Sequence, residues 1–189
     1  MRQSISGNLT GQPATLPAGL FCEPAAAPAL VLGIGNLLLG DEGAGIRAVE
    51  ELAARYALPP EVEAIDGGTM GLELLPYLAG RKLLILVDAV RTGAPPGTVV
   101  QMELADSSGF FREKISPHQI GMAEVLSVAA FTGDLPGRIV LIGVVPKEMA
   151  TGLALSPEIA SKIVVMADMV AAELTAAGFP LARRDPAAE

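Results

Sequence analysis

The sequence predicts a three-layer α/β/α fold of the α/β class. In this fold, helices cover both faces of a mostly parallel, twisted central sheet of about five strands. Short apolar runs alternate along the chain with segments whose apolar residues recur at helical spacing, a pattern typical of parallel sheets. Hydrophobic residues make up 51% of the 189 residues and charged residues 18%, so we expect a packed body. This length suits a single domain.

The first four predicted elements are a strand, a helix, a strand and a helix. Residues 30–35 form an apolar run ended by glycines, and residues 44–56 repeat apolar side chains at helical spacing. Residues 62–65 predict the second strand, and a glycine-rich turn joins it to a helix predicted at 70–78. Alternation of this kind favours parallel strands.

The next elements include one strand with a different direction. Residues 83–87 predict a third apolar strand. A Pro-Pro-Gly turn at 95–97 leads into a strand at 98–104, and because the connection is too short for a helical crossover, this strand is expected to be antiparallel to its neighbour. Residues 121–131 then predict a helix and residues 138–145 a buried strand.

The two ends of the chain differ from its middle. Residues 157–177 predict a long closing helix capped by Ser156. Residues 1–28 mix small polar residues with prolines and show no periodicity, so they are expected to form a flexible N-terminal extension. A single domain is therefore expected at 29–180, followed by a C-terminal tail at 181–189.

Composition excludes several classes of function. The formal net charge of −8, with no basic stripe, makes nucleic acid an unexpected partner. The only cysteine, Cys22, leaves no internal disulfide and suits the reducing cytoplasm, where we expect the protein to act as a monomer. The apolar run at 83–87 is far shorter than the roughly 20 residues of a membrane span, so we expect no membrane insertion.

The glycines after the first strand allow a nucleotide-binding interpretation. Gly33 and Gly35 follow an apolar strand and precede a helix, as in dinucleotide-binding loops. The third glycine position is Leu38, however, and the first acidic residue at a strand end, Asp66, lies 31 residues after Gly35 where about 20 is usual. These departures disfavour nucleotide binding.

The same loop brings two acids to the start of the first predicted helix. Asp41 suits the N-cap position, and this local role is the favoured interpretation for it. Glu42 has a longer side chain, which can either complement the helix dipole or extend across the strand ends.

Three residues form a candidate metal site. Asp88 follows the central strand at 83–87, where either loop amides or a functional partner would satisfy its carboxylate. His118 is the only histidine, which excludes a metalloprotease of the H-E-x-x-H class, and it lies just before a predicted helix. Glu42, Asp88 and His118 each follow a strand or open a helix, and together they offer two carboxylates and one imidazole to a first-row divalent metal. Their wide spacing leaves this set a hypothesis.

Asp66 has two open interpretations. It begins the turn Asp66-Gly67-Gly68, where its carboxylate can stabilise the turn or act in catalysis.

Four separated motifs follow the strands and open the helices of the predicted fold. They are Gly33-Ile34-Gly35-Asn36-Leu37-Leu38-Leu39-Gly40-Asp41-Glu42-Gly43, Asp66-Gly67-Gly68-Thr69, Val87-Asp88-Ala89 and Ile115-Ser116-Pro117-His118-Gln119-Ile120-Gly121. In order and spacing, over roughly residues 30–178, these motifs resemble the [NiFe]-hydrogenase maturation proteases. One departure is the start, because the family's first strand begins almost at the initiator methionine and here it begins about 29 residues later.

The resemblance implies an endopeptidase that removes the C-terminal extension of a [NiFe]-hydrogenase large-subunit precursor after nickel insertion. It implies that Glu42, Asp88 and His118 recognise nickel carried by the precursor, at a site that other divalent metals can also occupy. Asp66 is the candidate acid or base, as in an aspartic-type endopeptidase. The alternatives are a non-cleaving chaperone that binds the metallocentre, and a nucleotide-binding α/β enzyme.

Overall fold

The computed structural model describes residues 27–104 and 117–184, with the backbone alone for residues 117–120. The central sheet has five strands in the order β3-β1-β4-β6-β5. Strands β3, β1, β4 and β6 pair in parallel, and β5 is antiparallel to β6, as the short connection predicts. The strands are β1 (Ala29–Ile34), β3 (Val62–Gly68), β4 (Leu83–Ala89), β5 (Val99–Leu104) and β6 (Arg138–Val144).

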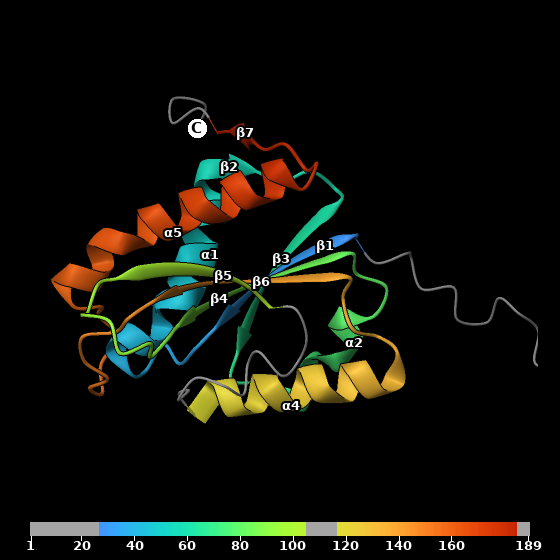
Figure 1. Ribbon diagram of the computed structural model, residues 1–189. Coiled ribbons are helices and arrows are strands. Elements are labelled where there is room, and N and C mark those ends of the chain that lie inside the picture. Colours follow the sequence, from blue (N-terminus) through green and yellow to red (C-terminus); the bar gives the residue numbers. More distant parts are fainter. Residues whose placement is uncertain (1–26, 105–116, 185–189) are drawn as a thin grey trace, which may run out of the picture.

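Helices cover both faces of this sheet, so the predicted three-layer α/β/α fold is confirmed (Figure 1). Helices α1 (Ala44–Arg55) and α5 (Pro157–Ala176) pack together on one face. Helices α2 (Leu75–Leu78) and α4 (Pro117–Thr132) lie on the other face. None of the helices in the described ranges combines the length and hydropathy needed to cross a bilayer.

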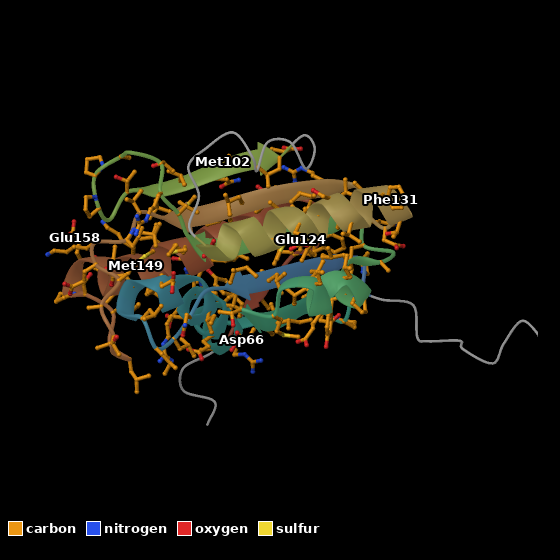
Figure 2. All side chains as sticks on the ribbon, turned by 90° about the horizontal axis from the view of Figure 1, so that it is seen from below. Asp66, Met102, Glu124, Phe131, Met149 and Glu158 are labelled. Atoms are coloured by element: carbon orange, nitrogen blue, oxygen red, sulfur yellow. The ribbon has the colours of Figure 1, made fainter. Side chains whose placement is uncertain are left out.

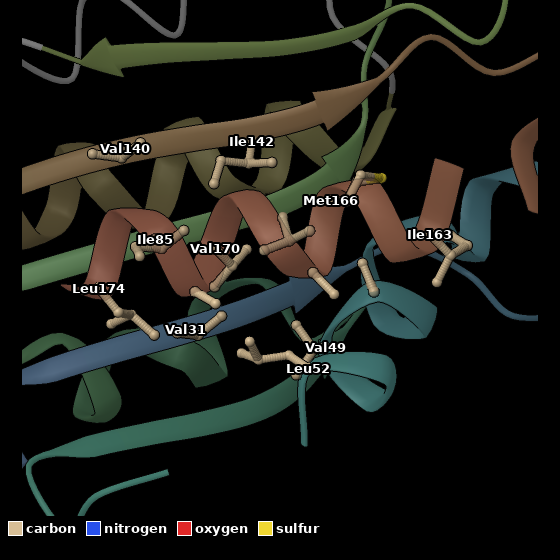
Figure 3. Close-up of a cluster of buried hydrophobic side chains, with 14 of the residues drawn as sticks. Val31, Val49, Leu52, Ile85, Val140, Ile142, Ile163, Met166, Val170 and Leu174 are labelled. Carbon is tan, nitrogen blue, oxygen red and sulfur yellow. The ribbon is translucent and has the colours of Figure 1, made fainter. Parts of the chain in front are cut away.

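Alternation along the strands divides the core into two halves. In β4, Ile85 faces the α1–α5 layer, whereas Leu84 and Leu86 face the α2–α4 layer. Figure 3 shows the first half, where Met166 and Val170 of α5 lie over the sheet. Because both faces are covered, β4 is buried along its whole length.

The edge strand β5 is held to β6 and α5 by Arg138. Its guanidinium donates two hydrogen bonds of 3.0 Å to the carboxylate of Glu103 and a third to Glu173. The hydrogen bonds from Arg138 lower the pKa of Glu103 below its ordinary value.

The helix predicted at 70–78 is two shorter elements. A 3-10 turn, η2 (Gly71–Leu74), precedes α2. Gly71 has a φ of 58°, which no regular α-helix includes, and Pro76 has no N–H to donate to the preceding turn. These two residues therefore prevent one continuous helix.

A two-stranded sheet, absent from the sequence prediction, joins the end of α1 to the C-terminal segment. Strand β2 (Tyr56–Ala57) pairs antiparallel with β7 (Ala182–Arg183), which lies in the predicted tail at 181–189. At the other end, residues 1–26 of the predicted extension lie outside the described residues. The carbonyl oxygen of Pro28 accepts hydrogen bonds from the backbone N–H groups of Lys82 and Leu83.

Candidate functional site

The loop after β1 packs tightly against the carboxyl ends of the strands. It contains a 3-10 turn, η1 (Gly40–Gly43), which leads directly into α1. A Cβ atom on Gly45 would lie 2.1 Å from the carbonyl oxygen of Val87 and 2.4 Å from that of Ile34. Only glycine at this position lets the first turn of α1 approach β1 and β4 so closely.

Gly35 has a related role in the same loop. Its φ is 137°, and an added Cβ would lie 1.9 Å from the carbonyl oxygen of Glu42. The chain's own backbone therefore fills the space that a phosphate would need in a dinucleotide-binding loop. This packing argues against the nucleotide-binding alternative.

Asp41 does not act as an N-cap, so that interpretation of the sequence is wrong. Neither η1 nor α1 has a side-chain cap hydrogen bond at its start. The fully buried carboxylate of Asp41 instead accepts hydrogen bonds from the backbone N–H groups of Lys147, Glu148 and Ser156, at 2.7–3.0 Å, and from the Ser156 hydroxyl at 3.0 Å. It ties the loop between β6 and α5 to the turn that carries Glu42.

Glu42 and Asp88 lie at the same edge of the sheet. Each is only 3% exposed, and η1, which carries Glu42, contacts β4, which carries Asp88. Alternation in β4 places Asp88 on the same face as Leu84 and Leu86, toward the layer formed by α2 and α4. One carboxylate oxygen of Asp88 accepts a hydrogen bond of 2.7 Å from the N–H of Ala89.

His118 lies in the first turn of α4, not before the helix as predicted, because α4 begins at Pro117. Proline suits the first helical position, where the missing N–H has no intrahelical acceptor. The next turn of α4, at Gly121 and Met122, borders a cavity of about 110 Å³ together with Ile34 at the end of β1. The start of α4 therefore lies at the sheet edge where β1 ends.

The side chain of His118 is outside the described part of the structure. Among side chains within that part, no group of three His, Cys, Asp or Glu residues could hold a metal ion. The structure thus brings the two predicted carboxylates to one edge, and the joint site with the imidazole stays a prediction.

Asp66 lies at the end of the edge strand β3 and is exposed (Figure 2). Its carboxylate accepts a hydrogen bond of 2.9 Å from the N–H of Gly68, whose φ is 45°. Asp66 therefore stabilises the turn that the two glycines allow. Its role as an acid or base stays a prediction.

A second cavity, of about 290 Å³, lies between the loops that follow β4 and β6. Arg91 and Lys147 line it, and the N–H of Val90 donates a hydrogen bond of 2.8 Å to the carbonyl oxygen of Val144 beside it. The carboxyl edge of the sheet thus offers open space between these two loops. The sequence did not indicate this cavity, because its walls come from two loops that are far apart along the chain.

Comparisons with known proteins agree with one another. The family model of the hydrogenase maturation proteases, HycI, matches residues 46–173. The chain is 42% identical over 157 residues to the hydrogenase 2 maturation protease of Escherichia coli (strain K12), covering 82% of this chain and 96% of that protein. It is 41% identical over 158 residues to the hydrogenase expression/formation protein HupD of Thiocapsa roseopersicina, covering 82% of this chain and 72% of that one.

The fold leads to the same family. The structure is similar to that of the hydrogenase maturating endopeptidase HybD from Escherichia coli, with a TM-score of 0.78, 42% identity, and coverage of 82% of this chain and 97% of that chain. The chain therefore belongs to the hydrogenase maturation proteases, a family of endopeptidases.

Proposed function

We propose that this endopeptidase removes the C-terminal extension of a [NiFe]-hydrogenase large-subunit precursor once nickel has been inserted. The observation that carries the proposal is the position of two buried carboxylates, Glu42 and Asp88, at one edge of the sheet. The first turn of α4, which contains His118, begins at the same edge. The second cavity, between the loops after β4 and β6 at the same end of the sheet, offers a precursor polypeptide room to approach.

The proposed role of the three residues is to recognise nickel that belongs to the substrate. Carboxylate oxygens and an imidazole nitrogen suit a first-row divalent ion, and other divalent metals can enter the same site. Burial of Glu42 and Asp88 limits competition from water, which strengthens their interaction with a cation. Holding nickel would place the nearby peptide bond of the precursor for attack.

Hydrolysis itself needs a proton acceptor or an activated water. Asp66 is the candidate acid or base, as an aspartic-type role would require, and nickel held by the substrate can polarise the carbonyl. The enzyme acts in this proposal as a cytoplasmic monomer. Cleavage becomes a checkpoint, because only a metal-loaded precursor is trimmed.

The test compares nickel-loaded with nickel-free precursor of the cognate large subunit. Incubated with the purified enzyme, the loaded form should lose the mass of its extension and the nickel-free form should stay intact, as intact-protein mass spectrometry would show. Equal cleavage of both forms would contradict nickel recognition. Stable complex formation without any loss of mass would instead favour the non-cleaving chaperone.

A further inference from the structure

Two loops at the carboxyl edge of the sheet are joined by their backbones. The N–H of Gly40 donates to the carbonyl oxygen of Gly152, and the N–H of Gly152 donates to that of Leu38, each at 2.9 Å. Leu39 and Gly152 thereby form a parallel β-bridge. We call the resulting feature the Leu38–Leu153 ridge, after the two side chains that it presents.

Asp41 also connects the two loops of the ridge. The buried carboxylate of Asp41 accepts hydrogen bonds from both ends of the loop that contains Leu153, at Lys147 and Glu148 near its start and at Ser156 at its end. The backbone hydrogen bonds at Gly152 and the charge-assisted hydrogen bonds to Asp41 together restrict the movement of both loops. A partner that binds the ridge has little loop entropy to remove.

The ridge holds two large aliphatic side chains in solvent. Leu38 is 62% exposed and Leu153 is 65% exposed, although most large hydrophobic residues of the described chain are buried. Exposed apolar side chains on adjoining backbone segments whose movement is restricted offer a surface that another macromolecule can cover.

The ridge is continuous with the candidate site. Leu38 lies four residues before Glu42 in the same loop, and the N–H of Glu42 donates a hydrogen bond of 3.3 Å to the carbonyl oxygen of Leu39. A polypeptide whose peptide bond reaches Glu42 and Asp88 must therefore pass close to this loop. If that polypeptide extends along the same loop, it covers Leu38 and Leu153.

We propose that the Leu38–Leu153 ridge is a docking site for an apolar segment of the large-subunit precursor next to the bond that is cut. This inference rests on the proposed function and adds a specificity element to it. The ridge contributes binding of the precursor and takes no part in the chemical step, so its loss should act on KM and leave kcat unchanged.

The experiment compares Leu38→Ser, Leu153→Ser and the double variant with the wild-type enzyme, using nickel-loaded precursor. Each single variant should raise KM about tenfold, the effect expected when a leucine no longer becomes buried on binding, and the double variant should raise it further. The kcat at saturating precursor should stay within about twofold. Thermal unfolding should be unchanged, since both side chains are exposed in the folded protein.

Phe131 provides a matched control. It is 93% exposed, and Figure 2 shows it at the opposite end of the molecule from Met149, which lies in the loop of the ridge. Phe131→Ser should leave KM unchanged. A wild-type KM in the double variant would overturn the proposal, and so would an equal rise of KM in Phe131→Ser, because it would reveal non-specific adhesion.

The docking proposal and the proposed function can fail independently, and the two failures give different experimental results. If the wild-type enzyme leaves loaded precursor uncut, the proposed function fails. The ridge is then tested by the dissociation constant for the same precursor in a surface-binding assay. An unchanged constant in the double variant overturns the docking site, and a rise confined to the ridge variants supports it.

Discussion

Glu42→Gln, Asp88→Asn and His118→Ala should each reduce processing of nickel-loaded precursor by more than about 100-fold. Each change removes one proposed nickel ligand, and losing even an outer-shell partner of a metal ligand typically costs about 10-fold to 100-fold. The two amide variants keep the size of the side chain, so they test the charge and not the packing. Single-turnover rates read by intact-protein mass would measure the loss.

Glu124→Gln is the control for loss of a carboxylate. Glu124 is exposed on α4, and its amide variant should process precursor at the wild-type rate (Figure 2). Circular dichroism should show that all variants keep the fold. Wild-type rates in all three site variants would show that nickel recognition has been assigned to the wrong residues.

Gly45→Ala should lower the free energy of unfolding by about 3 kcal/mol or more, because overpacking of this kind costs about 1–3 kcal/mol and here the clash is with backbone. The added methyl carbon would lie 2.1 Å from the carbonyl oxygen of Val87, which neither a rotamer change nor a small side-chain shift can relieve. Alanine has a better helix propensity than glycine by about 1 kcal/mol, but the steric term is larger. Urea unfolding followed by circular dichroism would measure the difference.

Gly121→Ala is the matched control for Gly45→Ala, because it makes the same substitution at a helical position where there is room for a methyl group. A Cβ at Gly121 would meet nothing closer than the Cα of Gly71 at 4.0 Å. This variant should raise the free energy of unfolding by about 0.5–1 kcal/mol, the usual gain from replacing a helical glycine. If Gly45→Ala were as stable as Gly121→Ala, the close approach of α1 to the strand ends would be wrong.

Features with a local signal were predicted correctly from the sequence. Residues 83–87 read as a buried strand because β4 is covered on both faces and has no polar side to interrupt its apolar run. The closing helix matches α5, whose N-cap Ser156 accepts a hydrogen bond from the N–H of Ile159. In parallel sheets, residues that follow the strands are expected at the carboxyl edge, and Glu42 and Asp88 do lie together at that edge.

Features that depend on distant partners could not be predicted. Asp41 has the local appearance of an N-cap, but its hydrogen-bond partners at Lys147 and Ser156 are 106 and 115 residues away in the sequence. Strands β2 and β7 have two residues each, too few for any periodicity. The earlier start of α4 did have a signal, because Pro117 is favoured at the first helical position.

Nickel K-edge X-ray absorption of the enzyme bound to nickel-loaded precursor would test most directly whether the enzyme's side chains ligate the substrate's nickel. Complex trapped by rapid freezing should show oxygen and nitrogen ligands in addition to those of the free precursor. The added ligands should decrease in Glu42→Gln and in Asp88→Asn. A nickel spectrum identical in free precursor and in the wild-type complex would contradict the proposed recognition.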